Sequence, residues 1–316
     1  MKSILAKAQI KAQPNGRPPA AVEITLDGVL AAAIPAPGQP AVYAFQPFAP
    51  GVLQPGIGEP NLRAPEAVSA AIRAALDQVS PRTHSVTVII PDTVVRVFVL
   101  DFDSLPAKQA DAFPVLRFRL RKMVPFEVEH AGISYQILSD KKDDTKVLAA
   151  VIPGAILAEY EAAVRAAGYE PGAVLSSSLA ALEAVGAGDS TTAMEAVLIA
   201  NLSPVALTTS ITSGQDLLLY RTLDLPEDPA AHVEEVRRGV AVAAAYYEDK
   251  LGAAPTSLHF AGSLGSGEPG AEGFTNWLDG FDLSVVELAP RPSTGAINSL
   301  GLASIAAVAG ALAGVR

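Results

Sequence analysis

The chain has 316 residues, of which 50% are hydrophobic, and a formal net charge of −10. This length and apolar content allow one or two substantial cores, and we expect two lobes. The negative charge disfavours nucleic acid as a partner, and the absence of cysteine excludes disulfides, thiol nucleophiles and Cys-ligated zinc. The N-terminal segment lacks the uninterrupted apolar core of a signal peptide, so export is not expected.

The beginning of the chain predicts three strands, a helix and a further strand. Three short apolar runs lie within residues 21–46, and Asp27-Gly28 between the first two is a strong signal for a hairpin turn. Pro65 opens a segment whose apolar residues recur at helical spacing as far as Val79.

A small β-β-α-β unit with a basic helix is expected next. Two β-branched runs, Val86–Ile90 and Val94–Leu100, predict strands joined through Pro91-Asp92. The helix should begin near Ser104, whose hydroxyl can cap it, with a kink at Pro114. Its cations either form a solvated face paired with glutamates or bind carboxylates of a partner or acidic lipid headgroups: Arg117, Arg119, Arg121 and Lys122.

Three patterns that can signal catalysis have simpler explanations. Asp101 and Asp103 alternate as in Asp-x-Asp metal sites, but acidic residues before a helix also favour its dipole. The four histidines show no metal-ligand spacing, and Ser176–Ser178 lacks the glycines of a nucleophile elbow. We therefore predict no catalytic residues and no metal-ligating residues.

The second half repeats the order of the first. After small and polar residues at Gly186–Ser190, three strands are expected within residues 196–223, followed by a long helix that begins at Asp228-Pro229 and ends at Gly252. A strand, a helix, a strand and a buried apolar helix near the C-terminus complete it. We expect a first lobe of residues 1–188, with an inserted subdomain at about 94–152, and a second lobe of residues 189–316.

Four segments of the chain form a recognisable set: LDFDSLP, FRLRKMVPFEVE, GISYQIL and KVLAAVIP. With these segments the chain resembles the PilM family, the cytoplasmic actin-like component of the type IV pilus assembly platform. The resemblance implies an α/β class structure with a duplicated ribonuclease-H-like (actin-like ATPase) fold, in which ATP and Mg²⁺ can lie between the lobes. It also implies a cytoplasmic protein. The most membrane-like segment, Leu300–Val315, is shorter than the roughly 20 residues that a spanning helix needs, so we expect no transmembrane span. In the family, the inserted subdomain and its neighbouring lobe hold the N-terminal peptide of the inner-membrane protein PilN.

Both hairpins that bind nucleotide in this fold are altered when compared with the family's motifs. Glu23-Ile24-Thr25 stands in place of the first Asp-Ile-Gly, and Asn201-Leu202-Ser203-Pro204 in place of the second acidic turn. Thr25 lacks the backbone freedom of glycine, Asn201 is neutral, and Pro204 has no N–H to donate to phosphate. The segment that would lie against adenosine contains Gly262, Ser263 and Gly265.

These observations favour an interaction protein over an enzyme. The first hypothesis is a PilM-like adaptor that docks a PilN-like inner-membrane protein and other pilus platform components, with ATP binding weak or lost. Its guessed partner contacts are Arg117, Arg119, Arg121 and Lys122. The alternatives are an active ATPase or kinase of the actin-like superfamily, and the cytoplasmic actin-like module of a type II secretion system.

Overall fold

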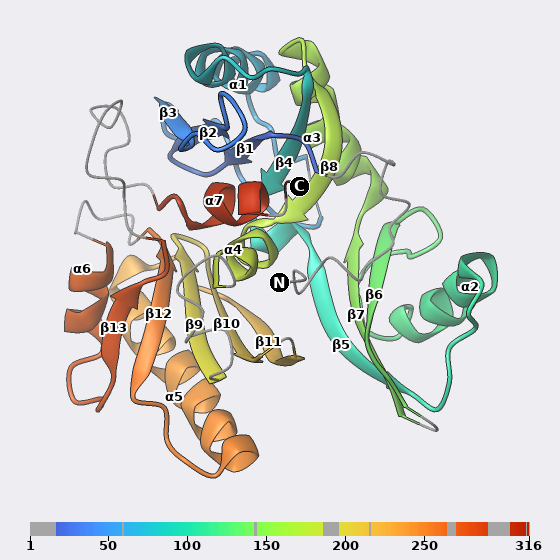
Figure 1. Cartoon of the computed structure of the whole chain (residues 1–316), viewed down its shortest axis with the longest axis vertical. Helices are drawn as coiled ribbons and strands as arrows, with labels where there is room; N and C mark the ends of the chain where they lie inside the picture. The colour runs from blue at the N-terminus through green and yellow to red at the C-terminus, as the bar shows by residue number, and fades with distance from the viewer. Residues whose placement is uncertain are drawn as a thin grey trace.

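Two five-stranded sheets and one three-stranded sheet form the frame of the molecule (Figure 1). The computed structural model describes residues 17–58, 60–141, 144–185, 196–214, 216–263, 270–289, 304–313 and 315. Each five-stranded sheet begins with three antiparallel strands in sequence and adds two parallel ones. The duplicated strand order expected from the sequence is therefore present.

The first sheet has the order β3-β2-β1-β4-β8, and β1, β4 and β8 run parallel. Its strands are β1 (Ala20–Ile24), β2 (Gly28–Ala33), β3 (Val42–Pro47), β4 (Ser85–Ile90) and β8 (Glu170–Ser176). Every residue of β1 and β2 is buried, as expected of strands covered on both faces.

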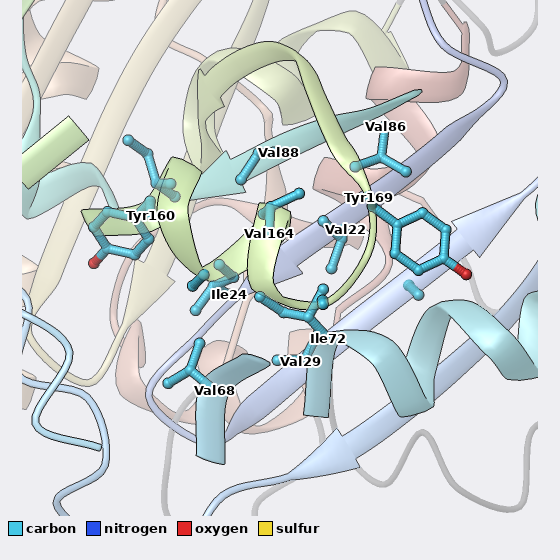
Figure 2. Packing of buried hydrophobic residues seen from close by; sticks show 14 of the residues in the cluster. Val22, Ile24, Val29, Val68, Ile72, Val86, Val88, Tyr160, Val164 and Tyr169 are labelled. Carbon is cyan, nitrogen blue, oxygen red and sulfur yellow. The ribbon is translucent and has the colours of Figure 1, made fainter. Parts of the chain in front are cut away.

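Two helices, α1 (Pro65–Val79) and α3 (Gly154–Ala166), cover one face of this sheet. Figure 2 shows their side chains, among them Ile72 of α1 and Val164 of α3, packed against Val22 and Val88 of the strands. The periodic apolar residues of α1 that the sequence marks as buried are buried in the structure. Removing this much apolar surface from water is the main force that holds the lobe together.

The other face of the first sheet is covered by α4 (Ser177–Val185) and α7 (Ala306–Ala313). The backbones of these two helices approach closely. A Cβ on Gly310 would lie 2.0 Å from the carbonyl oxygen of Ala180, so only glycine fits at this position. The expected division of the chain assigned the final apolar helix to the second lobe. In the structure α7 packs on the first sheet, and no described helix is long and apolar enough to cross a membrane.

The second sheet has the order β11-β10-β9-β12-β13, covered on one face by α5 (His232–Leu251) and α6 (Gly270–Trp277). Its strands are β9 (Ala196–Ser203), β10 (Ala206–Ser213), β11 (Asp216–Asp224), β12 (Ser257–Gly262) and β13 (Ser284–Glu287). Asp228 caps the short 3₁₀ helix η2 (Pro229–Ala231) that leads into α5, and Gly252 ends α5, as predicted. The expected lobe boundary at 188/189 lies outside the described residues.

The inserted unit consists of β5 (Arg96–Phe102), α2 (Gln109–Leu120), β6 (Gly132–Lys141) and β7 (Asp144–Ile152), with strand order β5-β7-β6. Its order is therefore β-α-β-β. The strand that the sequence grouped with it is β4, which is a buried central strand of the first sheet. A 3₁₀ turn, η1 (Asp92–Val94), redirects the chain between the two sheets.

The start of α2 differs from the sequence-based expectation. The helix begins at Gln109, five residues after Ser104, and its first turn has no side-chain cap, so capping by Ser104 is wrong. Pro114 lies inside the helix. The position of α2 is set by burial of Ala112, Leu116 and Leu120 against the small sheet, which outweighs the local capping signal.

Candidate functional site

Polar side chains gather where the parallel strands of the first sheet end. Glu23 is near the end of β1, Asp92 follows β4, and Ser177 and Ser178 follow β8 at the start of α4. Because β1, β4 and β8 are adjacent and parallel, their carboxyl ends lie at one edge of the sheet. This edge is where open α/β sheets ordinarily place a ligand.

The second sheet contributes Asn201 of β9 and Thr208 of β10 to the same place. The amide nitrogen Nδ2 of Asn201 lies 2.8 Å from Oγ of Ser178, 3.2 Å from Oγ of Ser177 and 3.3 Å from Oδ2 of Asp92. The two sheets are thus linked by direct hydrogen bonds. We call this group the inter-sheet cluster: Glu23, Asp92, Ser177, Ser178, Asn201 and Thr208.

Asp92 is the main acceptor of the inter-sheet cluster. Its Oδ1 accepts a hydrogen bond from the backbone N–H of Ser178 at 3.0 Å, and its Oδ2 accepts from the hydroxyls of Ser178 and Thr208. Asp92 keeps some exposed area, yet desolvation by the surrounding protein raises the pKa of its carboxyl, and the bonds from Ser178 and Thr208 oppose that rise.

Glu23 is a second carboxylate of the cluster and is only 7% exposed. Its Oε1 accepts a hydrogen bond of 2.7 Å from the hydroxyl of Ser177. Burial raises the pKa of Glu23 to about 7, the bond from Ser177 acts against this rise, and repulsion from Asp92 adds to it. The cluster thus holds two carboxyl groups that resist becoming charged together.

The two hairpin turns use their polar groups internally. The hydroxyl of Thr25 donates to the carbonyl of Gly28 at 3.0 Å and accepts from the N–H of Gly28 at 3.2 Å. In the second turn, Oγ of Ser203 accepts from the N–H groups of Ala206 at 3.1 Å and Val205 at 3.4 Å. Thr25 and Ser203 therefore stabilise the turns, while Glu23 and Asn201 reach the cluster.

The glycine-rich segment after β12 packs on the second hairpin. Gly262 has a φ of 104°, and a Cβ on it would lie 1.9 Å from the carbonyl oxygen of Leu202. The N–H of Ser263 donates to the same carbonyl at 2.8 Å. Glycine is thus required here by backbone packing alone. Gly265 lies outside the described residues.

The basic helix divides into two pairs of cations. Arg117 donates to the carbonyl oxygens of Val128 and Glu129, and Arg121 pairs with the carboxylate of Glu129. The expected solvated face paired with glutamates is therefore present for Arg121. Arg119 and Lys122 form no ion pair with any part of the chain that the structure describes.

The sequence pointed to Glu23 and Asn201, but it missed the rest of the cluster: Asp92, Ser177, Ser178 and Thr208. A recognisable signal was an acidic residue directly after the buried run that ends at Ile90. Another was a serine run between a strand and a helix. Among the described residues no group of three or more His, Asp or Glu side chains could hold a metal ion.

Comparisons with known proteins identify the fold. No protein-family model matches the chain, and no curated protein sequence matches it. A solved structure described as the "PilM-PilN type IV pilus biogenesis complex" is similar at a TM-score of 0.72 and 18% identity, covering 94% of this chain and 98% of that chain. A Bacteroides thetaiotaomicron protein with an actin-like ATPase fold matches at a TM-score of 0.54 and 13% identity, covering 96% and 98%. The chain therefore has the actin-like ATPase fold, and over nearly its whole length it is PilM-like in structure.

Proposed function

We propose that this protein is a PilM-like cytoplasmic adaptor of a type IV pilus assembly platform. In this proposal it docks the N-terminal peptide of a PilN-like inner-membrane protein, which holds it at that membrane. The observation that carries the proposal is the structural similarity to the chain of the PilM-PilN complex, which extends over 94% of this chain and 98% of the other.

The inserted unit offers a suitable place for an extended peptide. β6 lies at the edge of the three-stranded sheet, and no described strand pairs with its outer side. The opposite edge strand, β5, contacts β11 of the second sheet. An exposed strand edge can accept a peptide through backbone hydrogen bonds, with side chains adding specificity. The edge of β6 thus supports docking at the inserted unit.

We further propose that ATP binding is weak or lost, because the residues of the inter-sheet region do not fit Mg²⁺-nucleotide. In the second hairpin, Pro204 has no N–H, and those of Val205 and Ala206 already donate to Ser203. Asn201 is neutral and is shared among Asp92, Ser177 and Ser178. Phosphate needs free N–H donors, and Mg²⁺ prefers charged oxygens, so these contacts favour a pseudo-ATPase.

Two measurements test the proposal. The N-terminal peptide of a PilN-like inner-membrane protein should bind in isothermal titration calorimetry, and a scrambled peptide should not. Mg²⁺-ATP should leave the melting temperature unchanged, whereas a bound ligand at about 100 times its Kd would stabilise the protein by about 2.7 kcal/mol. Absence of peptide binding would refute the adaptor function, and a Mg²⁺-dependent shift would favour an active ATPase or kinase.

A further inference from the structure

The outer face of α2 and the turn that follows the helix carry large apolar side chains that face solvent. Phe118 is 66% exposed, Met123 is 40% exposed and Val115 is 36% exposed. The buried face of the helix already packs on the small sheet, so α2 has apolar residues on both sides. Figure 1 shows α2 on the outer side of the small sheet, away from both five-stranded sheets.

Two cations lie on the same outer face. Val115, Phe118, Arg119 and Lys122 are spaced i, i+3, i+4 and i+7, so they form one continuous face of the helix and its following turn. The ammonium nitrogen of Lys122 lies 5.7 Å from the ring centroid of Phe118. We call this surface the α2 patch: Val115, Phe118, Arg119, Lys122 and Met123.

The cations of the α2 patch are available to an external anion. Arg117 and Arg121 are held by residues 128–129, whereas Arg119 and Lys122 form no ion pair in the described part of the protein. An exposed aromatic ring such as that of Phe118 prefers the interfacial region of a lipid layer. Cations such as Arg119 and Lys122 prefer the lipid phosphates. The α2 patch combines both kinds of group.

We propose that the α2 patch binds an anionic lipid surface, with Phe118 in the headgroup region and Arg119 and Lys122 on lipid phosphates. The proposal does not rest on the proposed adaptor function, because it needs only these exposed side chains. It identifies a direct membrane contact in addition to any contact through a protein partner.

The size of the α2 patch favours lipid over a protein partner. Three partly exposed apolar side chains can bury roughly 200 to 300 Å², whereas the apolar part of a stable protein interface is about 450 Å² on each side. A lipid contact can be useful even when it is weak. Any second attachment of the protein to the membrane raises the effective concentration of the α2 patch at the lipid surface.

The net charge of the whole chain does not prevent this contact. Residues 106–130 hold five Lys or Arg against three Asp or Glu, while residues 224–316 hold five against twelve. The negative excess therefore lies mainly in the second half of the chain. Charges farther than about 8 Å from the lipid are largely screened at physiological ionic strength.

The test is co-flotation of the full chain with vesicles of phosphatidylglycerol or of phosphatidylcholine. Wild type should float with the anionic vesicles, weakly with the neutral ones, and less at high salt. Arg119→Glu/Lys122→Glu should lower the fraction bound to anionic vesicles by at least about ten-fold, because two charges are reversed at the lipid surface. Phe118→Ser should also lower it.

Charge-matched controls separate the α2 patch from a general effect. Arg82→Glu/Lys250→Glu makes the same change in net charge at exposed positions elsewhere, and Val242→Ser removes another exposed apolar residue. Both should float like wild type, and circular dichroism should show all variants folded. Equal losses in patch and control variants would overturn the proposal.

Two further outcomes would also overturn it. One is an absence of wild-type binding to anionic vesicles. The other is a concentration-dependent self-association in solution that Phe118→Ser abolishes, which would identify the patch as a protein interface. The α2 patch proposal assigns to lipid two cations, Arg119 and Lys122, that the sequence analysis took as partner contacts. Peptide titration of Arg119→Glu/Lys122→Glu keeps the two proposals apart, because this variant should bind the PilN-like peptide normally and lose only the vesicles.

Discussion

The amide nitrogen Nδ2 of Asn201, on the second sheet, lies 3.3 Å from Oδ2 of Asp92, which follows the first sheet. The carboxylate of Asp92 also accepts hydrogen bonds from Ser178 and Thr208. The polar groups that face each other between the sheets therefore satisfy one another. In an actin-like fold this arrangement links the two lobes through the protein's own side chains.

Replacing Asp92 tests this link. Asp92→Ala leaves the enclosed donors of Ser178, Asn201 and Thr208 without their shared acceptor, so the free energy of unfolding should fall by about 3 kcal/mol. Urea denaturation at neutral pH measures it. Asp101→Ala is the control, because its carboxylate is 71% exposed and pairs with Lys146 at 3.5 Å. The control should change stability by less than about 0.5 kcal/mol, and an equal loss in both variants would contradict the assigned role.

The raised pKa of Glu23 predicts a pH-dependent stability. The folded pKa of about 7 lies above the usual 4.5, so the native state holds this proton more tightly than the unfolded state does. The free energy of unfolding should therefore fall as the pH rises from 4.5 towards 7. Glu23→Gln removes the charge, and above pH 7 it should be more stable than wild type by up to on the order of 3 kcal/mol.

The measurement is a series of denaturant unfolding curves from pH 4.5 to pH 8. The stability difference between Glu23→Gln and wild type should grow with pH across this range. Glu170→Gln is the control, since this carboxylate is 71% exposed, and its curve should run parallel to that of wild type. A constant difference between Glu23→Gln and wild type would show that Glu23 titrates normally.

Local patterns predicted most of the fold. Apolar spacing gave α1 and its buried face, and Asp228-Pro229 and Gly252 marked the ends of the segment that contains η2 and α5. The patterns were less reliable where tertiary packing decides. α2 starts after the apparent cap at Ser104. Val233 and Leu251 are apolar residues of α5, yet they are 36% and 37% exposed.

The site was predicted only in part, because its members meet through strand order. Glu23 and Asn201 belong to hairpins with a recognisable pattern. Asp92 and Ser178 are 86 residues apart in sequence, and they approach only because β4 and β8 are parallel neighbours. That pairing depends on the long connection through the whole inserted unit and α3, which no short pattern encodes.

Gly262 provides a prediction about backbone packing. A Cβ at this position would lie 1.9 Å from the carbonyl oxygen of Leu202, and φ is 104°. Gly262→Ala should lower the free energy of unfolding by more than about 2 kcal/mol, since backbone must move. Gly252→Ala, with φ of 77° and nothing within 4 Å, isolates the left-handed strain and should cost about 1 kcal/mol. Equal losses would indicate that packing on Leu202 is unimportant.

The two pairs of cations on the basic helix should respond differently to truncation. Arg117→Ala removes the donor to the carbonyls of Val128 and Glu129, so stability should fall by about 1 to 2 kcal/mol. Amide hydrogen exchange at residues 128–131 should become faster. Arg119→Ala removes no described hydrogen bond and should stay within about 0.5 kcal/mol of wild type with unchanged exchange. Faster exchange in both variants would contradict this division.

Introducing an acidic residue into the second hairpin gives the sharpest prediction. Asn201→Asp replaces a donor shared by Asp92, Ser177 and Ser178 with a third carboxylate beside Asp92 and Glu23. At pH 7 the variant should be less stable than wild type by about 3 kcal/mol or more, and the deficit should shrink as acid neutralises the carboxyl groups. Thermal unfolding across pH measures this deficit.

Mg²⁺-ATP should not restore the stability of Asn201→Asp, because Pro204 still lacks an N–H and the N–H groups of Val205 and Ala206 still donate to Ser203. Recovery of stability by Mg²⁺-ATP at neutral pH would show that this single substitution is enough to give nucleotide binding in the inter-sheet region.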